Sequence, residues 1–117
     1  VRGNTSKKIV EMVRKQGAKN VYFASAAPPV RYQNVYGIDM PATKELVAHG
    51  KTVEEIRLFI GADELIYQDI EDLRMAAHIG NTNITSFEDS VFTGKYCAGK
   101  ISEEYLSRLE NNRSSKE

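Results

Sequence analysis

Two short apolar runs, each preceded by a helical pattern, constrain the fold of this chain more than any other feature of its sequence. Residues 20–25 (NVYFAS) and 64–67 (ELIY) lack the apolar–polar alternation of a strand with one solvent-facing side. Such runs are typical of parallel strands that are buried on both faces. Parallel strands need a crossover between them, and a helix is the usual crossover. The pattern predicts an α/β fold with a parallel sheet and flanking helices.

Periodic apolar residues and capping signals predict five helices around these strands. They are expected to begin near Thr5 or Ser6, at Pro41, after Thr52, after Asp69 and after Ser102. The signal at Thr52 is a capping box with Glu55, and a stripe of Ile56, Phe59 and Ile60 follows it. We expect this stripe to be buried.

The pattern is weaker in the remaining segments. The helix from Pro41 is short and ends near Ala48, and residues 86–96 predict a hairpin or an irregular segment around Gly94. We assign residues 1–110 to one domain, because a chain of this length supports a single core. Residues 111–117 are polar and are expected to form a frayed tail.

The chain opens with a loop that leads directly into a helix, without a strand before it. In a parallel α/β sheet a strand precedes such a loop, so we expect the leading strands to lie upstream of Val1. A sheet without its leading strands exposes apolar helix faces and an open edge, both of which favour pairing. We therefore expect a homo-oligomer.

A loop rich in small polar residues stands at the start of the first helix. This N-terminal loop, residues 2–6 (RGNTS), is followed by two lysines. Gly3 lets the backbone approach a ligand closely, and the unpaired N–H groups of the helix start attract an anion. The residues alone leave two interpretations open, an anion site and an ordinary helix N-cap. Neither a Walker motif nor a dinucleotide-binding glycine motif is present.

Composition excludes several other functions. Sixteen basic residues balance sixteen acidic ones, so no net charge favours nucleic acid or anionic lipid, and no apolar run is long enough to span a membrane. Cys97 is the single cysteine, which excludes an internal disulfide and suits a reducing compartment such as the cytoplasm. His49 and His78 are far apart and lack a second ligand at metal-binding spacing. We expect no catalytic residue and no metal site in this chain.

Six motifs along the chain resemble a known enzyme family. They are residues 1–6 (VRGNTS), 21–28 (VYFASAAP), 35–41 (VYGIDMP), 54–57 (EEIR), 60–63 (IGAD) and 92–94 (FTG). Together they resemble the amidophosphoribosyltransferases of purine biosynthesis, from the start of the chain to about residue 109. The resemblance implies that residues 1–110 are the C-terminal portion of a type I phosphoribosyltransferase domain, with a Rossmann-like parallel sheet and a C-terminal helix.

The resemblance also implies a reaction. Family members are glycosyltransferases that make 5-phosphoribosylamine from phosphoribosyl pyrophosphate and glutamine, with a glutaminase domain upstream in the same chain. Mg²⁺ would be held through residues upstream of this segment, and purine nucleotides inhibit the enzyme. The segment is expected to be inactive alone. Two alternatives stay open: a regulatory module that chiefly binds an inhibitory nucleotide, and a structural or self-associating fragment with no measurable ligand.

Particular residues of this chain match the binding motifs of the family. The resemblance assigns the ribose 5-phosphate to the N-terminal loop: Arg2, Gly3, Asn4, Thr5 and Ser6. It suggests Ser25 and Pro28 as nucleotide contacts and assigns no catalytic residue to this segment. One branch of the family holds an iron–sulfur cluster through cysteines. The corresponding positions here are Asn34, Glu88 and Val91, which are not thiolate ligands, so we expect no iron–sulfur cluster.

Overall fold

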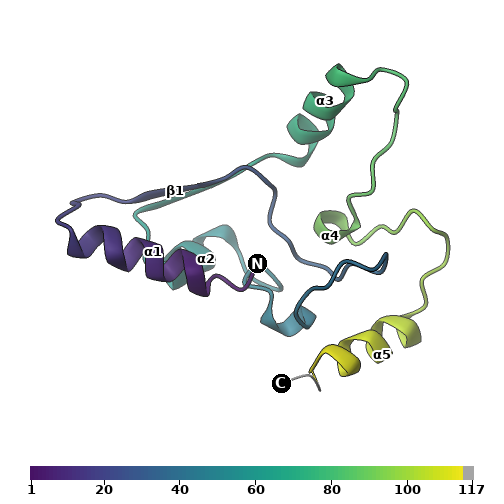
Figure 1. Ribbon diagram of the computed structural model, residues 1–117, viewed down its shortest axis with the longest axis horizontal. Helices are drawn as coiled ribbons and strands as arrows, with labels where there is room; N and C mark the ends of the chain where they lie inside the picture. The colour runs from purple at the N-terminus through teal and green to yellow at the C-terminus, as the bar shows by residue number, and fades with distance from the viewer. Residues whose placement is uncertain (115–117) are drawn as a thin grey trace.

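The computed structural model describes residues 1–114 and contains a small parallel sheet, as the sequence predicts (Figure 1). Its two strands are β1 (Tyr22–Ser25) and β2 (Glu64–Tyr67). They pair in parallel, with Phe23 opposite Leu65. The predicted α/β class is confirmed.

Helices lie before, between and after the two strands: α1 (Asn4–Lys15), α2 (Val53–Ile60) and α3 (Ile70–Gly80). The rest of the described chain contains the 3₁₀ helix η1 (Thr43–Glu45), the single turn α4 (Ser90–Thr93) and the C-terminal helix α5 (Glu103–Ser114). None of the helices within residues 1–114 combines the length and the apolarity that crossing a membrane requires.

One face of the sheet carries the hydrophobic core. The opposed residues Phe23 and Leu65 belong to a single cluster with Val10 of α1 and with Ile56 and Ile60 of α2. Figure 1 shows both helices on the same side of the strands. Burial of these side chains is the main driving force for packing the two helices on the sheet.

The other face of the sheet is open, so the prediction that both faces are buried is wrong. Tyr22 is 66% exposed and Ile66 is 58% exposed, and Ala24 between them is exposed as well. The run of apolar residues predicted two covered faces, but α1 and α2 lie on one side of the sheet. Within the described residues, therefore, the outer face of the sheet is uncovered and mainly apolar, with the charged Glu64 opposite Tyr22.

The ends of α2 follow the sequence signals. The Thr52 hydroxyl accepts a hydrogen bond from the Glu55 N–H (3.2 Å), and the Glu55 carboxylate accepts one from the Thr52 N–H (2.7 Å), which confirms the capping box. Gly61 ends the helix with φ 76°. The predicted stripe is only partly buried, because the Phe59 side chain is 40% exposed and lies at the edge of the core beside Gly3.

The predicted helix over residues 41–48 is wrong. Only the three residues of η1 are helical, because the backbone becomes extended at Leu46 (φ −66°, ψ 122°). The chain then turns, and both Leu46 and Ala48 become buried. Packing of these two side chains therefore overrides the local helical preference.

Residues 86–96 form no hairpin. The segment contains only the single turn α4, which Gly94 ends with φ 74°. The Tyr32 ring lies against Gly94, where an added Cβ would be 3.0 Å from its Cε1 atom. Of the two alternatives predicted, the irregular segment is confirmed, with a one-turn helix inside it.

Helix α5 continues beyond the start of the predicted tail and is attached to the molecule by polar contacts. The Glu110 carboxylate accepts a hydrogen bond from the Thr43 N–H (2.7 Å), and the Arg113 guanidinium donates one to the Asn34 carbonyl (3.0 Å). Residues 115–117 of the predicted tail lie outside the described residues. The boundary at residue 110 stays a prediction.

One carboxylate connects α1 to the beginning of both strands. Asp63, which immediately precedes β2, accepts hydrogen bonds from the Val21 N–H and from the Arg14 guanidinium, both at 2.7 Å. The Arg14 guanidinium also donates to the Gly61 carbonyl (2.9 Å). The hydrogen bond from Val21, and after it the pairing with Arg14, hold the pKa of Asp63 below its usual value.

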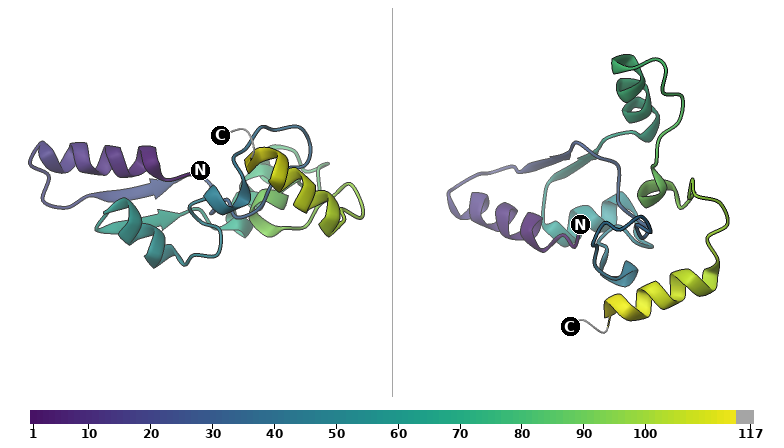
Figure 2. Two further views of the ribbon diagram at one scale, coloured as in Figure 1. Left: turned by 90° about the horizontal axis from the view of Figure 1, so that it is seen from below. Right: turned by 45° about the vertical axis from the view of Figure 1, so that its right-hand side comes forward.

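Helix α3 stands apart from this core. In Figures 1 and 2 it projects away from α1, α2 and the strands. None of its residues is fully buried, and Ile79 near its end is 75% exposed. The Asp69 carboxylate caps the start of α3 by accepting from the Glu71 N–H (2.8 Å).

Replacing Asp63 with Asn is expected to lower the thermal unfolding midpoint at neutral pH, because the ion pair with Arg14 is lost and the acceptor for the Val21 N–H becomes neutral. The pKa is lowered in the folded chain, so the stabilisation is complete above the unfolded value of about 3.9 and is lost as the pH falls through the folded value. Circular dichroism melts from neutral to about pH 3 should show the two midpoints converging. Asp39→Asn in an exposed loop is the control. A constant difference at all pH values would contradict the role of the charge.

Candidate functional site

The N-terminal loop turns into α1 at Gly3, which has the left-handed φ of 79° and is buried. The predicted side-chain caps Thr5 and Ser6 lie inside the helix instead, and no side chain caps its start. The first helical hydrogen bond runs from the Lys7 N–H to the Gly3 carbonyl (2.9 Å). The N–H groups of residues 4–6 therefore have no acceptor within the helix, as at any helix start.

Apolar packing explains why residue 3 is a glycine. A Cβ added there would lie 2.8 Å from Cγ2 of Val47 and 2.9 Å from Cε1 of Phe59. Positive φ disfavours other residues as well. Packing and positive φ thus each require glycine here; close approach to a ligand, the reason given from the sequence, stays a prediction.

Residues within and just after η1 hold the N-terminal loop from the side. The Arg2 guanidinium forms an ion pair with Glu45 (3.0 Å), and the Val47 N–H donates to the Val1 carbonyl (3.0 Å). Lys7, one turn into α1, has its ammonium 5.7 Å from the centre of the Phe59 ring.

A cavity of about 240 Å³ lies at this helix start and at the carboxyl ends of both strands. It brings together four of the residues suggested by the sequence: Gly3, Ser6, Ser25 and Pro28. Arg2, Asn4 and Thr5 do not line it. The remaining lining residues are mainly apolar: Val1, Phe23, Ala27, Val30, Val47, Ala48, Ile56, Ile60, Leu65 and Tyr67.

Tyr67 is the polar residue of this cavity that sequence reasoning missed. It ends β2 directly opposite Ser25 of β1. Its position at the end of a predicted strand could have indicated it, since ligands of parallel α/β sheets bind at the carboxyl ends of the strands. Burial raises the pKa of Tyr67, with the charge of Arg31 opposing the shift. Its phenol therefore stays protonated and can donate a hydrogen bond.

The cavity suits binding better than acid–base chemistry. The residues that line it include no aspartate, glutamate, histidine or cysteine. The Ser25 hydroxyl already donates to the Ala27 carbonyl (2.8 Å), which shapes the turn after β1. What the cavity offers is a helix start, hydroxyl groups and apolar walls, a combination that accommodates an anion attached to a less polar group.

The histidines and the cysteine in the described part of the chain lie outside this cavity. Within residues 1–114 no three histidine, cysteine or acidic side chains are placed to hold a metal ion. His49 and His78 each lie against a backbone carbonyl, of Arg31 (3.0 Å) and of Ile84 (2.8 Å) respectively. Hydrogen bonding with Glu88 raises the pKa of the Cys97 thiol, which disfavours the reactive thiolate.

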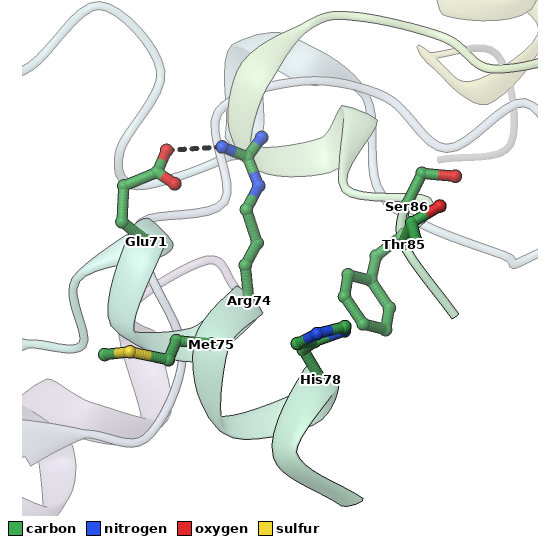
Figure 3. Close-up of a pocket in the computed structure, with 7 residues that line it drawn as sticks. Glu71, Arg74, Met75, His78, Thr85 and Ser86 are labelled. Atoms are coloured by element: carbon green, nitrogen blue, oxygen red, sulfur yellow. Dashed lines mark hydrogen bonds and ion pairs between the residues drawn. The ribbon is translucent and has the colours of Figure 1, made fainter. Parts of the chain in front are cut away.

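A second, larger cavity of about 710 Å³ lies between α3 and the residues that follow it (Figure 3). Its guanidinium, Arg74, is already paired with Glu71 and with Asp89. The His78 ring and Met75 lie along the same helix. Because its cationic group has two carboxylate partners, this cavity has little attraction for an anion.

Known proteins are similar to this chain in sequence. No protein-family model matches the chain. The amidophosphoribosyltransferase of Haemophilus influenzae is 54% identical over 113 residues, which are 97% of this chain and 22% of that protein. The chain thus spans about a fifth of the length of this curated relative.

Solved structures agree with the sequence match. The chain is similar to the glutamine phosphoribosylpyrophosphate amidotransferase of B. subtilis complexed with ADP and GMP (TM-score 0.71, 34% identity), over 91% of this chain and 24% of the other. It is also similar to a structure described as the allosteric regulatory enzyme of purine biosynthesis (TM-score 0.73, 33% identity), over 94% and 24%. The resemblance predicted from the sequence, and the predicted fold as part of a phosphoribosyltransferase, are confirmed.

Gly3→Ala is expected to destabilise the chain by about 1–3 kcal/mol, because the new methyl group meets Val47 and Phe59 and because φ is positive. Urea unfolding measures the effect. Gly50→Ala is the matched control, since Gly50 also has a positive φ (65°) but open space where the methyl group would lie. An equal loss of stability in both variants would show that packing at Gly3 contributes nothing.

Proposed function

We propose that this chain, which matches part of the amidophosphoribosyltransferases in sequence and fold, forms the part of their active site that holds a ribose 5-phosphate. The observation that carries the proposal is the cavity in which the start of α1 meets the carboxyl ends of β1 and β2. The N-terminal loop, residues 2–6, and the suggested nucleotide contacts, Ser25 and Pro28, come from segments about twenty residues apart in sequence. Four of these seven residues line that cavity.

The phosphate is proposed to bind at the start of α1. The backbone N–H groups of residues 4–6 and the positive end of the helix dipole favour a dianion there. The hydroxyls of Thr5 and Ser6 would add hydrogen bonds, and the ribose would extend towards the apolar walls and Tyr67. Charge-assisted hydrogen bonds of this kind are the strong ones in proteins.

The whole protein would make 5-phosphoribosylamine from phosphoribosyl pyrophosphate and glutamine, in the cytoplasm, with a glutaminase domain in the same chain. Mg²⁺ would neutralise the phosphates of the substrate. Residues outside this chain would hold the ion, because residues 1–114 offer no group of side chains suited to it. We propose that no iron–sulfur cluster is bound.

Purine nucleotides are proposed to bind at the same phosphate position and inhibit the enzyme. The support is the solved relative, which is described as complexed with ADP and GMP. A nucleoside monophosphate shares its ribose 5-phosphate with the substrate, so one anion site serves both.

A second candidate function is self-association without a ligand, and the uncovered apolar face of the sheet favours it. Tyr22 and Ile66 expose large apolar side chains on this face, in diagonal positions of the two strands. Sedimentation with and without GMP separates the candidates. The ligand-free function predicts oligomers and no GMP binding, whereas the proposed site predicts saturable GMP binding whatever the oligomeric state.

Thr5→Ala with Ser6→Ala is expected to weaken GMP binding by about ten- to thousandfold, since up to two charge-assisted hydrogen bonds are lost. Guanosine binding should change little, because the lost bonds go to phosphate. Calorimetry on the full-length protein measures both ligands. Thr85→Ala with Ser86→Ala removes the same pair of hydroxyls from the second cavity and is the matched control. Equal losses for GMP and guanosine, or an effect of the control pair, would exclude the loop as the phosphate site.

The 117-residue chain by itself is expected to produce no phosphoribosylamine from either glutamine or ammonia. The lining of the cavity provides no carboxylate, imidazole or thiol, and no metal site is formed by the described residues. Pyrophosphate release from phosphoribosyl pyrophosphate and ammonia, compared with a protein-free reaction, measures this. Release above that background would show that the chain contains catalytic groups of its own.

A further inference from the structure

A third cavity, of about 280 Å³, adjoins the candidate site at the carboxyl end of the sheet. It shares Pro28 with the first cavity, and Gln68 in its wall directly follows Tyr67, the last residue of β2. The Gln68 N–H donates to the Ser25 carbonyl (3.1 Å), so the two strands stay together as far as this residue. The other residues that line this side cavity are Pro29, Arg31, Asp69, Ile70, Phe92 and Thr93.

Arg31 gives the side cavity a cation that lacks a carboxylate partner. Its Nη1 atom donates to the carbonyls of Ala48 (2.5 Å) and Lys51 (2.7 Å), which fix the position of the guanidinium. Among residues 1–114 no ion pair includes Arg31, and its Nη2 and Nε atoms have no acceptor there. These atoms can therefore donate to a ligand. Arg74 in the second cavity differs, because two carboxylates already pair with it.

Gln68 gives the same cavity an amide that has no partner. Its side chain is half-buried and makes no hydrogen bond to another residue of the described chain. Such polar groups usually have a partner, and an amide offers both a donor and an acceptor to one. This amide is therefore available to a ligand with polar groups of its own.

The charges and the apolar walls of the side cavity favour a planar, uncharged group. Asp69 is an acidic residue of the lining, and its carboxylate also caps α3. Its negative charge opposes that of Arg31 and disfavours a second phosphate group. Pro29 and Phe92 supply apolar surface of the kind on which a ring packs.

We propose that the side cavity binds the base of a purine nucleotide whose phosphate lies at the start of α1, and that it prefers guanine to adenine. This inference rests on the proposed function, because the first cavity must hold the ribose 5-phosphate. A base attached to that ribose leaves the first cavity past the ends of the strands, where Pro28 and Gln68 stand.

The preference for guanine follows from the donors of Arg31. The O6 and N7 atoms of guanine both accept hydrogen bonds, and a guanidinium can donate to the two together. Adenine has an amino group in place of O6, so it presents a donor to the guanidinium. The Gln68 amide and the Asp69 carboxylate can accept from the remaining N–H groups of guanine.

The test uses calorimetry on the full-length protein, with GMP, AMP and ribose 5-phosphate as ligands. Gln68→Leu removes the amide without breaking a hydrogen bond of the described fold. Gln16→Leu, at the exposed end of α1, is the matched control. Arg31→Lys keeps the charge and loses the planar arrangement of donors. Thermal unfolding checks each variant, and Gln68→Leu carries the test if Arg31→Lys is unfolded.

Gln68→Leu is expected to weaken GMP binding about tenfold and to change ribose 5-phosphate binding by less than about twofold. Arg31→Lys should weaken GMP binding by a similar factor and AMP binding less, so that the preference for GMP shrinks. Gln16→Leu should leave all three affinities unchanged.

Four results would overturn the assignment of the base. Equal losses for GMP and ribose 5-phosphate would mean that these residues support the fold or the sugar phosphate. No loss for GMP would place the base elsewhere. A larger loss for inorganic pyrophosphate than for GMP would make the side cavity an anion site. In these three cases ribose 5-phosphate still binds to the wild-type protein, and the proposed phosphate site stands. A wild-type protein that binds neither GMP nor ribose 5-phosphate would remove both proposals.

Discussion

The contact of Asp63 with Arg14 and Val21 is the interaction on which the arrangement of this molecule depends. Arg14 is in the last turn of α1, and Val21 and Asp63 stand just before the two strands. Because α1 runs back along β1, fixing the end of the helix at the start of the strands places its beginning near their carboxyl ends. A helix of twelve residues is roughly 18 Å long. One surface carboxylate thereby helps to set the position of the α1 start, the proposed phosphate site, at the opposite end of the sheet.

The sequence predicts helices and strands well where neighbouring residues determine them. The capping box of Thr52 and the cap of Asp69 place two helices correctly, and both strands occur where the apolar runs lie. Which face of the sheet is covered could not be predicted, because that depends on the side on which two helices pack. The failure over residues 41–48 has the same origin, since burial of Leu46 competes with a helical pattern.

The residues of the candidate site divide in the same way, into those that have a local sequence signal and those that do not. Gly3 and Ser6 were found because a glycine and hydroxyls at a helix start form a local motif, and the cavity brings them beside Ser25 and Pro28. The ion pair between Arg2 and Glu45 was not predicted. The two residues are more than forty positions apart in sequence, and a single glutamate matches no sequence motif. Tyr67 was missed for a different reason. It was read as part of a buried strand, although the end of a parallel strand is a usual place for ligand contacts.

The packing of Gly3 against Val47 and Phe59 has an evolutionary consequence. The N-terminal loop and the apolar core share this position, so they cannot change independently. A larger residue at position 3 is compatible with the fold only if the side chains at 47 or 59 become smaller in the same lineage. Among diverging relatives, these three positions should therefore vary as one unit, even though one belongs to the N-terminal loop and the other two to the residues that pack against it.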